Sequence, residues 1–252
     1  MSFARLAGKT AVVTGSSTGI GQAVAFALHT EGAQVVCADL EERRQGSDDT
    51  EVPTHEQINK AGGKAIFVQT DVTRADSVKR LVKEAVSHFG RIDIFINNAG
   101  VTGQDGSIML SNEAWDRNFA INARGTSLGC KYAGAQMKKQ GQLPSMDRGW
   151  IINIAGVQTG STGESPSKHS LVTDMTQTIA QELRDHDIHV NAITPGYTKM
   201  SMPENGLETE EALAAIAKLP EDVAKMVVQL ATEESGWMAG NSVSVDSGNA
   251  TF

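Results

Sequence analysis

The chain has 252 residues, which is enough for one large α/β domain or two small ones around a sizeable core. Its net charge is −8, from 22 Lys and Arg against 30 Asp and Glu, and this acidic balance disfavours binding to nucleic acids and anionic membranes. No apolar run approaches the roughly 18 residues of a membrane span, and residues 1–10 contain no apolar signal core. We expect a soluble protein with neither a nucleic-acid nor a membrane partner.

The two cysteines, Cys37 and Cys130, lie in an apolar run and in a helical pattern. We interpret both as buried free thiols, which favours a reducing compartment and so the cytoplasm. The six histidines are scattered and the cysteines are far apart in sequence, so no metal site is predicted.

Short apolar runs alternate with longer amphipathic stretches along the chain. In chain order, the predicted elements are a strand at 10–14, a helix at 19–31, a strand at 34–39, a polar loop at 41–54, a helix at 55–61, a strand at 65–69, a helix at 75–89, a strand at 92–97, a helix at 113–139, a strand at 150–155, a helix at 167–185, a strand at 189–194, helices at 208–218 and 221–231, and a strand at 242–245.

Unbroken β-branched strands that alternate with helices predict an α/β fold, with a parallel sheet of about seven strands covered by helices on both faces. No internal repeat and no Pro/Gly/Ser-rich linker divides the chain, so residues 1–252 are predicted to form a single doubly wound domain. Ligands of such sheets bind beyond the carboxyl ends of the strands, and the polar motifs of this chain follow its strands.

The first such motif is TGSSTGIG at residues 14–21, between the first strand and the first helix. Glycines there allow a tight turn and a close approach of backbone to a pyrophosphate, which the positive end of the helix attracts. A glycine-rich turn can also be purely structural. Its place between a strand and a helix favours phosphate binding.

Asp39 ends the second strand, 18 residues after Gly21. A carboxylate at that place accepts hydrogen bonds from adenosine ribose hydroxyls and repels a 2′-phosphate, so it favours NAD over NADP. Arg43 and Arg44 follow in the loop, either as solvated charges or within reach of a phosphate.

Further motifs follow the later strands. They are Asp71-Val72, NNAG at residues 97–100, Asn122 within FAINARGT, the strand at 151–155, Ser167-Lys168, Pro195-Gly196 and VDSG at residues 245–248. Together with TGSSTGIG, these motifs resemble the short-chain dehydrogenase/reductase family, in order and over nearly the whole chain. The resemblance implies a single Rossmann-like domain, a homodimer or homotetramer, and NAD(P)-dependent oxidation of alcohols or reduction of carbonyls.

The resemblance also implies a set of cofactor contacts, which divides by the part of the nucleotide that is bound. Gly15, Ser17, Thr18 and Ile20 would line the pyrophosphate, Asp39 the ribose, Asp71 and Val72 the adenine, Asn98, Ala99 and Gly100 the second ribose, Lys168 the nicotinamide ribose, and Pro195 and Thr198 the carboxamide. Met200 departs from the family, which usually places a threonine there.

The family's proton relay is not retained. It uses a tyrosine four residues before the lysine, a lysine that lowers the tyrosine pKa, an orienting serine, and an asparagine that holds a water. This chain keeps Asn122 and Lys168, but Glu164 occupies the tyrosine position and Gly156 aligns with the serine. The stretch between Gly156 and Glu164 is also shorter than in the family.

Pro166 alters the backbone at this place. A proline is well suited to the first helical position, and it disfavours helical geometry at the residue before it. We therefore expect Ser165 as the helix N-cap and Glu164 outside the helix, so Glu164 need not stand one turn from Lys168.

Glu164 is either a catalytic base or substrate contact, or a solvated loop carboxylate. Its ordinary pKa of about 4.3, against about 10 for tyrosine, makes it a poor acid at neutral pH. The other side chains considered for proton transfer or hydrogen bonding lie nearby, and they are Ser161, Thr162, Ser165, His169 and Tyr197.

Three functions stay open. The first is an NAD-dependent oxidoreductase with a rebuilt proton relay, acting on a small-molecule carbonyl, alcohol or imine. The second is a non-redox isomerase, cyclase or lyase on the same scaffold, and the third is a cofactor-binding protein without catalysis. Residues 200–220 are expected to cover the substrate pocket as a mobile lid, and the helices at 113–139 and 167–185 are expected to form a two-fold interface.

Overall fold

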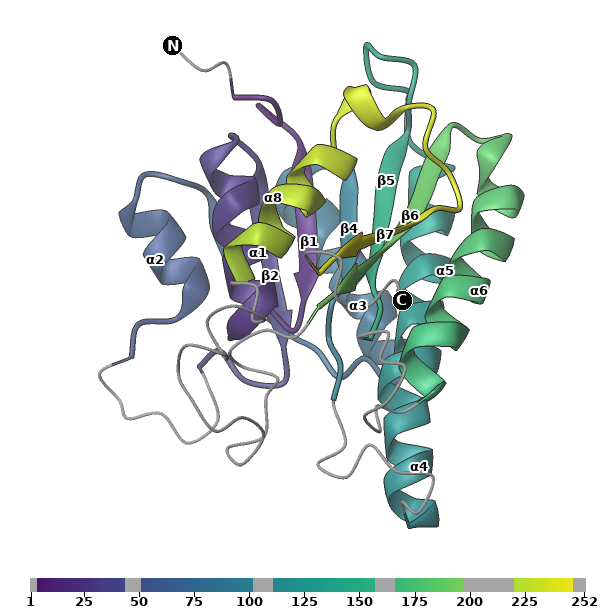
Figure 1. Ribbon diagram of the computed structural model, residues 1–252. Coiled ribbons are helices and arrows are strands. Elements are labelled where there is room, and N and C mark those ends of the chain that lie inside the picture. The colour runs from purple at the N-terminus through teal and green to yellow at the C-terminus, as the bar shows by residue number, and fades with distance from the viewer. Residues whose placement is uncertain (1–3, 44–50, 102–110, 157–165, 197–219, 247–252) are drawn as a thin grey trace.

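The computed structural model describes residues 4–43, 51–101, 111–156, 166–196 and 220–246, and the side chains of residues 166–170 fall outside that description. Seven parallel strands form one sheet in the order β3-β2-β1-β4-β5-β6-β7 (Figure 1). The strands are β1 (Thr10–Thr14), β2 (Gln34–Asp39), β3 (Ala65–Gln69), β4 (Ile94–Asn97), β5 (Gly149–Ile154), β6 (Ile188–Pro195) and β7 (Ser242–Val245). The predicted fold class is confirmed.

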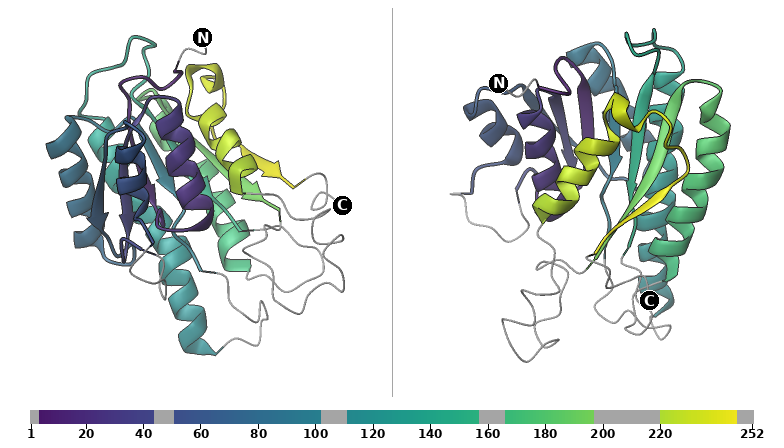
Figure 2. Two further views of the ribbon diagram at one scale, coloured as in Figure 1. Left: turned by 90° about the vertical axis from the view of Figure 1, so that its left-hand side faces the viewer. Right: turned by 45° about the horizontal axis from the view of Figure 1, so that its top comes forward.

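Helices cover both faces of the sheet (Figure 2). They are α1 (Gly19–Thr30), α2 (Thr54–Lys60), α3 (Ala75–Phe89), α4 (Asn112–Phe119), α5 (Thr126–Met137), α6 (Pro166–Arg184) and α8 (Pro220–Leu230). Buried side chains of α1, α2 and α8 form one apolar core with the sheet, and those of α3, α5 and α6 form a second core on the opposite face. Alternate residues of each buried strand supply the two cores, as expected for a sheet without a solvent-facing side.

The chain reverses its direction of winding between β1 and β4, which are neighbours in the sheet but not in the sequence. Crossovers to β2 and β3 extend to one side, and those to β5, β6 and β7 extend to the other. The crossovers after β1 and β4 therefore go to opposite sides of this switch point, and open α/β sheets bind ligands in the crevice at the carboxyl edge of such a point.

Residues 112–137 are helical without a gap, close to the predicted helix at 113–139, but they are not α-helical throughout. The α-helical pattern breaks at a π-helical turn, Ala120–Gly125, between α4 and α5. The reason is a tertiary contact, because the Asn122 side chain bonds to the backbone of Val101 through two hydrogen bonds of 2.9 Å. Such a local widening is frequent at functional sites, and here it lies at the carboxyl edge of the sheet.

The other boundaries differ by one or two residues. β4 begins at Ile94 and not at Ile92, because both backbone groups of Ile92 bond to the Gln140 side chain. α6 begins at Pro166, which confirms the predicted first helical position of that proline. The predicted helix at 208–218 lies outside the described residues. Among the described residues, no helix combines the length and apolarity needed to cross a bilayer.

Candidate functional site

The turn between β1 and α1 is held closed by glycines. Gly15 has a φ of +67°, in the left-handed region, and its N–H donates to the carbonyl of Ala38 at 2.8 Å. A Cβ atom on Gly21 would lie 2.0 Å from the Gly15 oxygen, so no other residue fits there. These two glycines bring the turn back over the start of α1, as the phosphate-loop prediction requires.

The N-terminus of α1 carries no side-chain cap. Thr18 occupies the N-cap position with an extended backbone and forms no capping hydrogen bond. The first N–H groups of a helix have no partner within the helix, and together with the helix dipole they favour a bound anion. The predicted pyrophosphate residues Ser17, Thr18 and Ile20 all lie at this helix start.

Asn98 fastens the same turn to the end of β4. Its side-chain nitrogen donates to the carbonyls of Thr14 and Gly15, at 3.0 Å each. The Thr14 hydroxyl accepts from the backbone N–H groups of Asn98 and Ala99, at 3.0 and 3.1 Å, and donates to the carbonyl of Ile96. The amide nitrogen of Asn98 is therefore committed to the protein, and the ribose contact predicted for Asn98, Ala99 and Gly100 stays a prediction.

Asp39 lies at the carboxyl end of β2, beside the phosphate turn. Its Oδ2 accepts the backbone N–H of Ser17 at 3.0 Å, and its Oδ1 accepts that of Leu40 at 2.8 Å. The Ser17 hydroxyl donates to the carbonyl of Glu41 at 2.6 Å. The half-buried carboxylate is thus held in one orientation at the edge of the crevice, where it retains acceptor capacity for a ligand hydroxyl.

Asp71 and Val72 follow β3. The Asp71 Oδ1 accepts both the backbone N–H and the hydroxyl of Thr73, at 2.9 and 2.7 Å. Val72 packs on the π-helical turn, where a Cβ atom on Gly125 would lie 3.0 Å from a Val72 methyl group. Both residues are half-buried on the β2 side of the crevice, and their predicted adenine contact stays untested.

Asn122 is buried within the π-helical turn, with 1% of its surface exposed. Its Oδ1 accepts from the N–H of Val101 and its Nδ2 donates to the carbonyl of Val101, while its own carbonyl accepts from the Thr126 hydroxyl. The side chain therefore fixes the chain just after β4. A catalytic role for Asn122 stays a prediction.

A buried polar network connects β4, β5 and α6 beneath the crevice. The Asn97 side chain donates to the Asn153 Oδ1 at 2.8 Å, and the Asn153 Nδ2 donates to the Thr176 hydroxyl at 2.9 Å. Thr176 in turn donates to the carbonyl of Val172 at 2.7 Å, and Cys130 lies 3.4 Å from the Asn153 Oδ1. The network fixes α6 relative to β4, so it sets the position of the helix that contains Lys168.

The predicted residues of the catalytic end are only partly described. Lys168 is the third residue of α6, and its side chain lies outside the described part. Pro195 ends β6 and pairs with Val245 in β7, with its ring buried. Gly156, buried after β5, supplies no hydroxyl. The residues outside the described ranges are Glu164, Thr198, Ser161, Thr162, Ser165, Tyr197 and Met200, and the same holds for the side chain of His169.

Sequence reasoning missed a second contact on the phosphate turn. The Thr54 hydroxyl, at the start of α2, donates to the carbonyl of Ser16 at 2.9 Å and accepts from the Gln22 Nε2 at 3.1 Å. Thr54 is buried, with 2% of its surface exposed. Its only signal in the sequence is a hydroxyl residue after Pro53, next to a helical pattern. Among the described residues, no group of three or more His, Cys, Asp or Glu side chains is placed to hold a metal ion.

Comparisons with known proteins cover nearly all of the chain. A family model described as enoyl-(acyl carrier protein) reductase matches residues 15–250. A short chain dehydrogenase/reductase, astE, of Aspergillus oryzae is 35% identical over 260 residues, covering 96% of this chain and 95% of the relative. A (3R)-3-hydroxyacyl-CoA dehydrogenase of Mus musculus is also 35% identical, covering 97% of each chain. The crystal structure of a short-chain type dehydrogenase/reductase from Mycobacterium marinum superposes with a TM-score of 0.82, at 30% identity, over 98% of this chain and 97% of the other.

Proposed function

This chain belongs to the short-chain dehydrogenase/reductase family, and on that premise we propose that it is an NAD(H)-binding oxidoreductase with a rebuilt proton relay. Its substrate would be a small carbonyl, alcohol or imine compound. The observation that supports this most directly is the uncapped start of α1 beside the fixed carboxylate of Asp39. When bound, the nicotinamide supplies or accepts a hydride.

The residues of the crevice suit this nucleotide. A pyrophosphate fits the closed glycine turn and the free N–H groups of α1, while the Asp39 carboxylate suits ribose hydroxyls. The adenine would lie against Asp71 and Val72, and the nicotinamide half would extend past Asn98, Ala99 and Gly100. Lys168 would hold the second ribose, with Pro195 and Thr198 on the carboxamide side.

Asp39 favours NAD over NADP. A 2′-phosphate on the adenosine ribose would be placed next to this carboxylate, and two negative groups in contact repel each other. Glu41 and Glu42 lie two and three residues after Asp39 and add negative charge there, ahead of Arg43 and Arg44. NAD is therefore the proposed cofactor.

The proton chemistry differs from that of the family. With no tyrosine four residues before Lys168 and no hydroxyl at Gly156, the substrate oxygen lacks both of its usual partners. We assign Glu164 as a base or substrate contact, and Lys168 as a cation that favours its ionised form. A substrate that needs little acid assistance, such as an iminium ion or an activated carbonyl, would tolerate this arrangement.

The names of the relatives favour a hydroxyl or carbonyl substrate. One relative is a (3R)-3-hydroxyacyl-CoA dehydrogenase, and another, from Thermotoga maritima, is a 3-oxoacyl-(acyl-carrier-protein) reductase. Both names describe oxidation or reduction in an acyl chain. Alcohols, 3-hydroxyacyl thioesters and their oxidised forms are accordingly the first compounds to screen.

Two alternative functions are suggested by the absence of the family's tyrosine and serine hydroxyls. A protein that binds NAD without catalysis would retain the nucleotide residues and have no need of an acid above the nicotinamide. A non-redox isomerase, cyclase or lyase would use Glu164 as a base. Gly156, buried after β5 with no hydroxyl to offer, is the observation that favours both.

Binding and turnover separate the three functions. NADH and NADPH are titrated by fluorescence, and alcohols, carbonyls and imines are then screened by absorbance at the nicotinamide band. The oxidoreductase proposal requires tight NADH binding and turnover of at least one compound, with kcat reduced in Glu164→Gln and NADH affinity reduced in Lys168→Ala. Tight binding with no turnover on any compound leaves the alternatives, and absence of binding rejects the cofactor assignment.

We also propose a homodimer or homotetramer located in the cytoplasm. Apolar side chains are exposed on α4 and α6, with Trp115, Phe119 and Leu171 at 40%, 43% and 39% exposure. Large apolar groups gathered on neighbouring helices favour association with a second copy. Cys37 and Cys130 are both free and buried, as suits a reducing compartment.

A further inference from the structure

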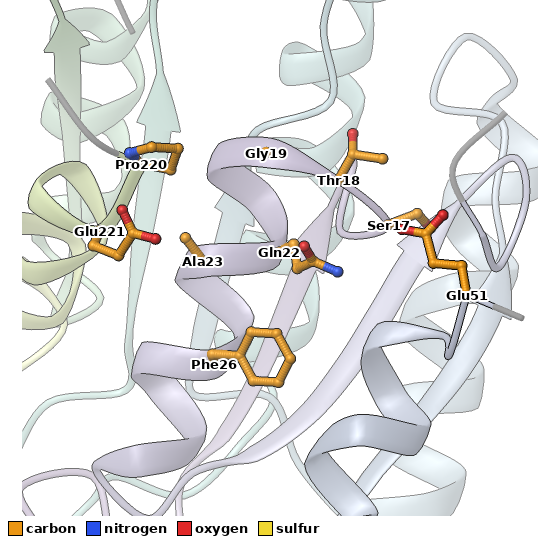
Figure 3. A pocket seen from close by; sticks show the side chains of 9 residues that line it. All are labelled: Ser17, Thr18, Gly19, Gln22, Ala23, Phe26, Glu51, Pro220 and Glu221. Atoms are coloured by element: carbon orange, nitrogen blue, oxygen red, sulfur yellow. The ribbon is translucent and has the colours of Figure 1, made fainter. Parts of the chain in front are cut away.

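A pocket opens on the outer side of the phosphate turn. It has a volume of about 320 Å³ and lies between the start of α1, the segment before α2 and the first turn of α8 (Figure 3). Ser17, Thr18 and Gly19 form one wall, Phe26 lines it further along α1, and Glu51 and Glu221 contribute carboxylates from opposite sides. The pocket therefore begins at the residues that would hold the pyrophosphate.

We propose that Glu51 is a specificity-determining residue, which holds a negative charge where the 2′-phosphate of NADP would have to lie. This inference rests on the proposed function, because it assumes that the nucleotide occupies the crevice. Glu51 would then be a second carboxylate, after Asp39, that selects against NADP, and it lies twelve residues beyond the end of β2.

The position of Glu51 is fixed through Thr54. The buried Thr54 hydroxyl bonds to the carbonyl of Ser16 and to the side chain of Gln22, which attaches the start of α2 to the phosphate turn. The Gln57 side chain donates to the carbonyl of Val52 at 2.6 Å and so holds the residue next to Glu51. With both neighbouring points anchored, the Glu51 side chain is directed toward the Ser17 end of the pocket (Figure 3).

The ribose and the pocket meet at Ser17. The Ser17 N–H bonds to the Asp39 carboxylate, and Ser17 also lines the pocket. A ribose held by Asp39 would have its 2′-hydroxyl on the side of Ser17 and of the pocket. A phosphate on that oxygen carries about two negative charges, and the adjacent free volume is the pocket that Glu51 enters.

The charge of the pocket opposes a phosphate. Its lining contains Glu51 and Glu221 and, among the described residues, neither Lys nor Arg. Neither of these carboxylates forms an ion pair within the described part of the chain. An unneutralised carboxylate repels a nearby phosphate, and more strongly in a partly enclosed site than in bulk water.

The test compares pairs of nucleotides that differ only in the 2′-phosphate. Dissociation constants for NADH and NADPH, and for 5′-AMP and adenosine 2′,5′-bisphosphate, are measured by calorimetry at low salt. The variants are Glu51→Gln and Glu51→Lys. The control is Glu56→Gln, which removes the same charge from an exposed position of α2 where Glu56 faces Lys60 at 3.8 Å. Circular dichroism melting shows that each variant is folded.

We expect Glu51→Gln to tighten NADPH and the bisphosphate about tenfold, and Glu51→Lys to tighten them further, with NADH and 5′-AMP within twofold of the unmodified protein. The control should leave all four constants unchanged, and added salt should shrink the effect. If both Glu51 variants still bind NADH but bind NADPH with the same affinity as the unmodified protein, this inference is overturned. Failure of the unmodified protein to bind NADH overturns the proposed function itself.

Discussion

Under the proposed function, Asp39 is the side chain on which nucleotide binding should depend most directly. It already accepts the N–H of Ser17, and the proposed ribose contact adds charge-assisted hydrogen bonds. Asp39→Ala should therefore weaken NADH binding by about 10- to 100-fold, which corresponds to one or two lost hydrogen bonds to a charged group. Fluorescence titration measures this. Asp39→Asn keeps the shape and one acceptor, so its NADH dissociation constant should lie between those of the unmodified protein and Asp39→Ala. An unchanged dissociation constant in Asp39→Ala contradicts the assignment.

The two cysteines give the protein a defined response to alkaline pH. Burial raises the pKa of the Cys37 thiol to about 12, and burial likewise raises the pKa of Cys130 to about 12, against 9.0 for a solvent-exposed thiol. At a pH between 9 and 12, each thiol has lost its proton in the unfolded chain but retains it in the folded protein. Stability is thus fully present below about pH 9 and is lost as pH rises toward 12, by about 1.4 kcal/mol per pH unit for each thiol.

Urea unfolding at a series of pH values from 8 to 11 checks this expectation. The two thiols together make the free energy of unfolding fall as the pH rises. Cys37→Ala and Cys130→Ala should each remove about half of that slope, because each variant lacks one of the two thiol protons. The single variants also serve as controls for each other, since all ionisable groups other than the two thiols are the same in both. An identical decline in all three proteins would show that the thiols are not protected by folding.

Local pattern was enough to find some site residues and not others. Gly15, Gly21 and Asp39 could be predicted because each stands at a fixed distance from a strand end that the sequence itself marks. Thr54 could not, because its importance comes from two partners, Ser16 and Gln22, that are more than thirty residues away. A hydroxyl group at a helix start looks the same in sequence whether it caps the helix or fastens another loop.

At the scale of elements, α4, α5 and the turn between them show where periodicity fails. Residues 113–139 read as one helix because their composition permits it throughout. The π-helical turn arises from the bonds between Asn122 and Val101 and from the close fit of Gly125 on Val72. Neither contact is local, so no hydrophobic repeat encodes it. The strands, in contrast, were predicted closely because unbroken β-branched runs with few alternatives define them.

The network between β5 and α6 gives a prediction about how the elements are joined. Thr176→Val removes the hydroxyl that accepts from Asn153, and it leaves a buried amide group without its partner. We expect the free energy of unfolding to fall by about 1–3 kcal/mol, together with a weaker NADH affinity as α6 loses its fixed position. Urea unfolding and NADH titration measure the two effects.

Thr176→Ser is the matched control for this prediction. It keeps the hydroxyl and removes only a methyl group, so it should retain NADH affinity and lose about 1 kcal/mol or less of stability. If Thr176→Val and Thr176→Ser lose the same stability, packing of the methyl group explains the effect. If both keep full NADH affinity, the network does not position the site.

At the scale of the whole molecule, the alternation of strands and helices correctly predicted the α/β class and the seven-stranded parallel sheet. The single domain and ligand binding at the carboxyl edge of the sheet stay predictions. The strand order, in contrast, is a finding of the structure, because the right-handedness of crossovers decides which face a helix covers and leaves several strand orders open. The proton-transfer end was less accessible to prediction. Pro166 disfavours helical geometry at the residue before it, and the path of the shortened stretch between Gly156 and Glu164 depends on packing that the neighbouring sequence does not specify.

The surface of α4 and α6 yields the last prediction, on assembly. Trp115, Phe119 and Leu171 are exposed apolar side chains on helices that contact each other, and a stable interface needs about 800 Å² from each partner. Burial of a charge among them would be costly, so Trp115→Glu combined with Phe119→Glu should dissociate the assembly. Light scattering coupled to size-exclusion chromatography measures the mass.

Two further variants make that measurement decisive. Met146→Glu changes an apolar residue of 62% exposure on the loop before β5, and it should leave the mass unchanged. Trp237 is fully exposed near β7, the edge strand of the sheet, so Trp237→Glu tests a separate surface. A tetramer built on both surfaces would fall to a dimer in Trp237→Glu, and a dimer built on α4 and α6 alone would not change. A monomer in the unmodified protein would contradict the proposed association, because the apolar side chains would then remain in water.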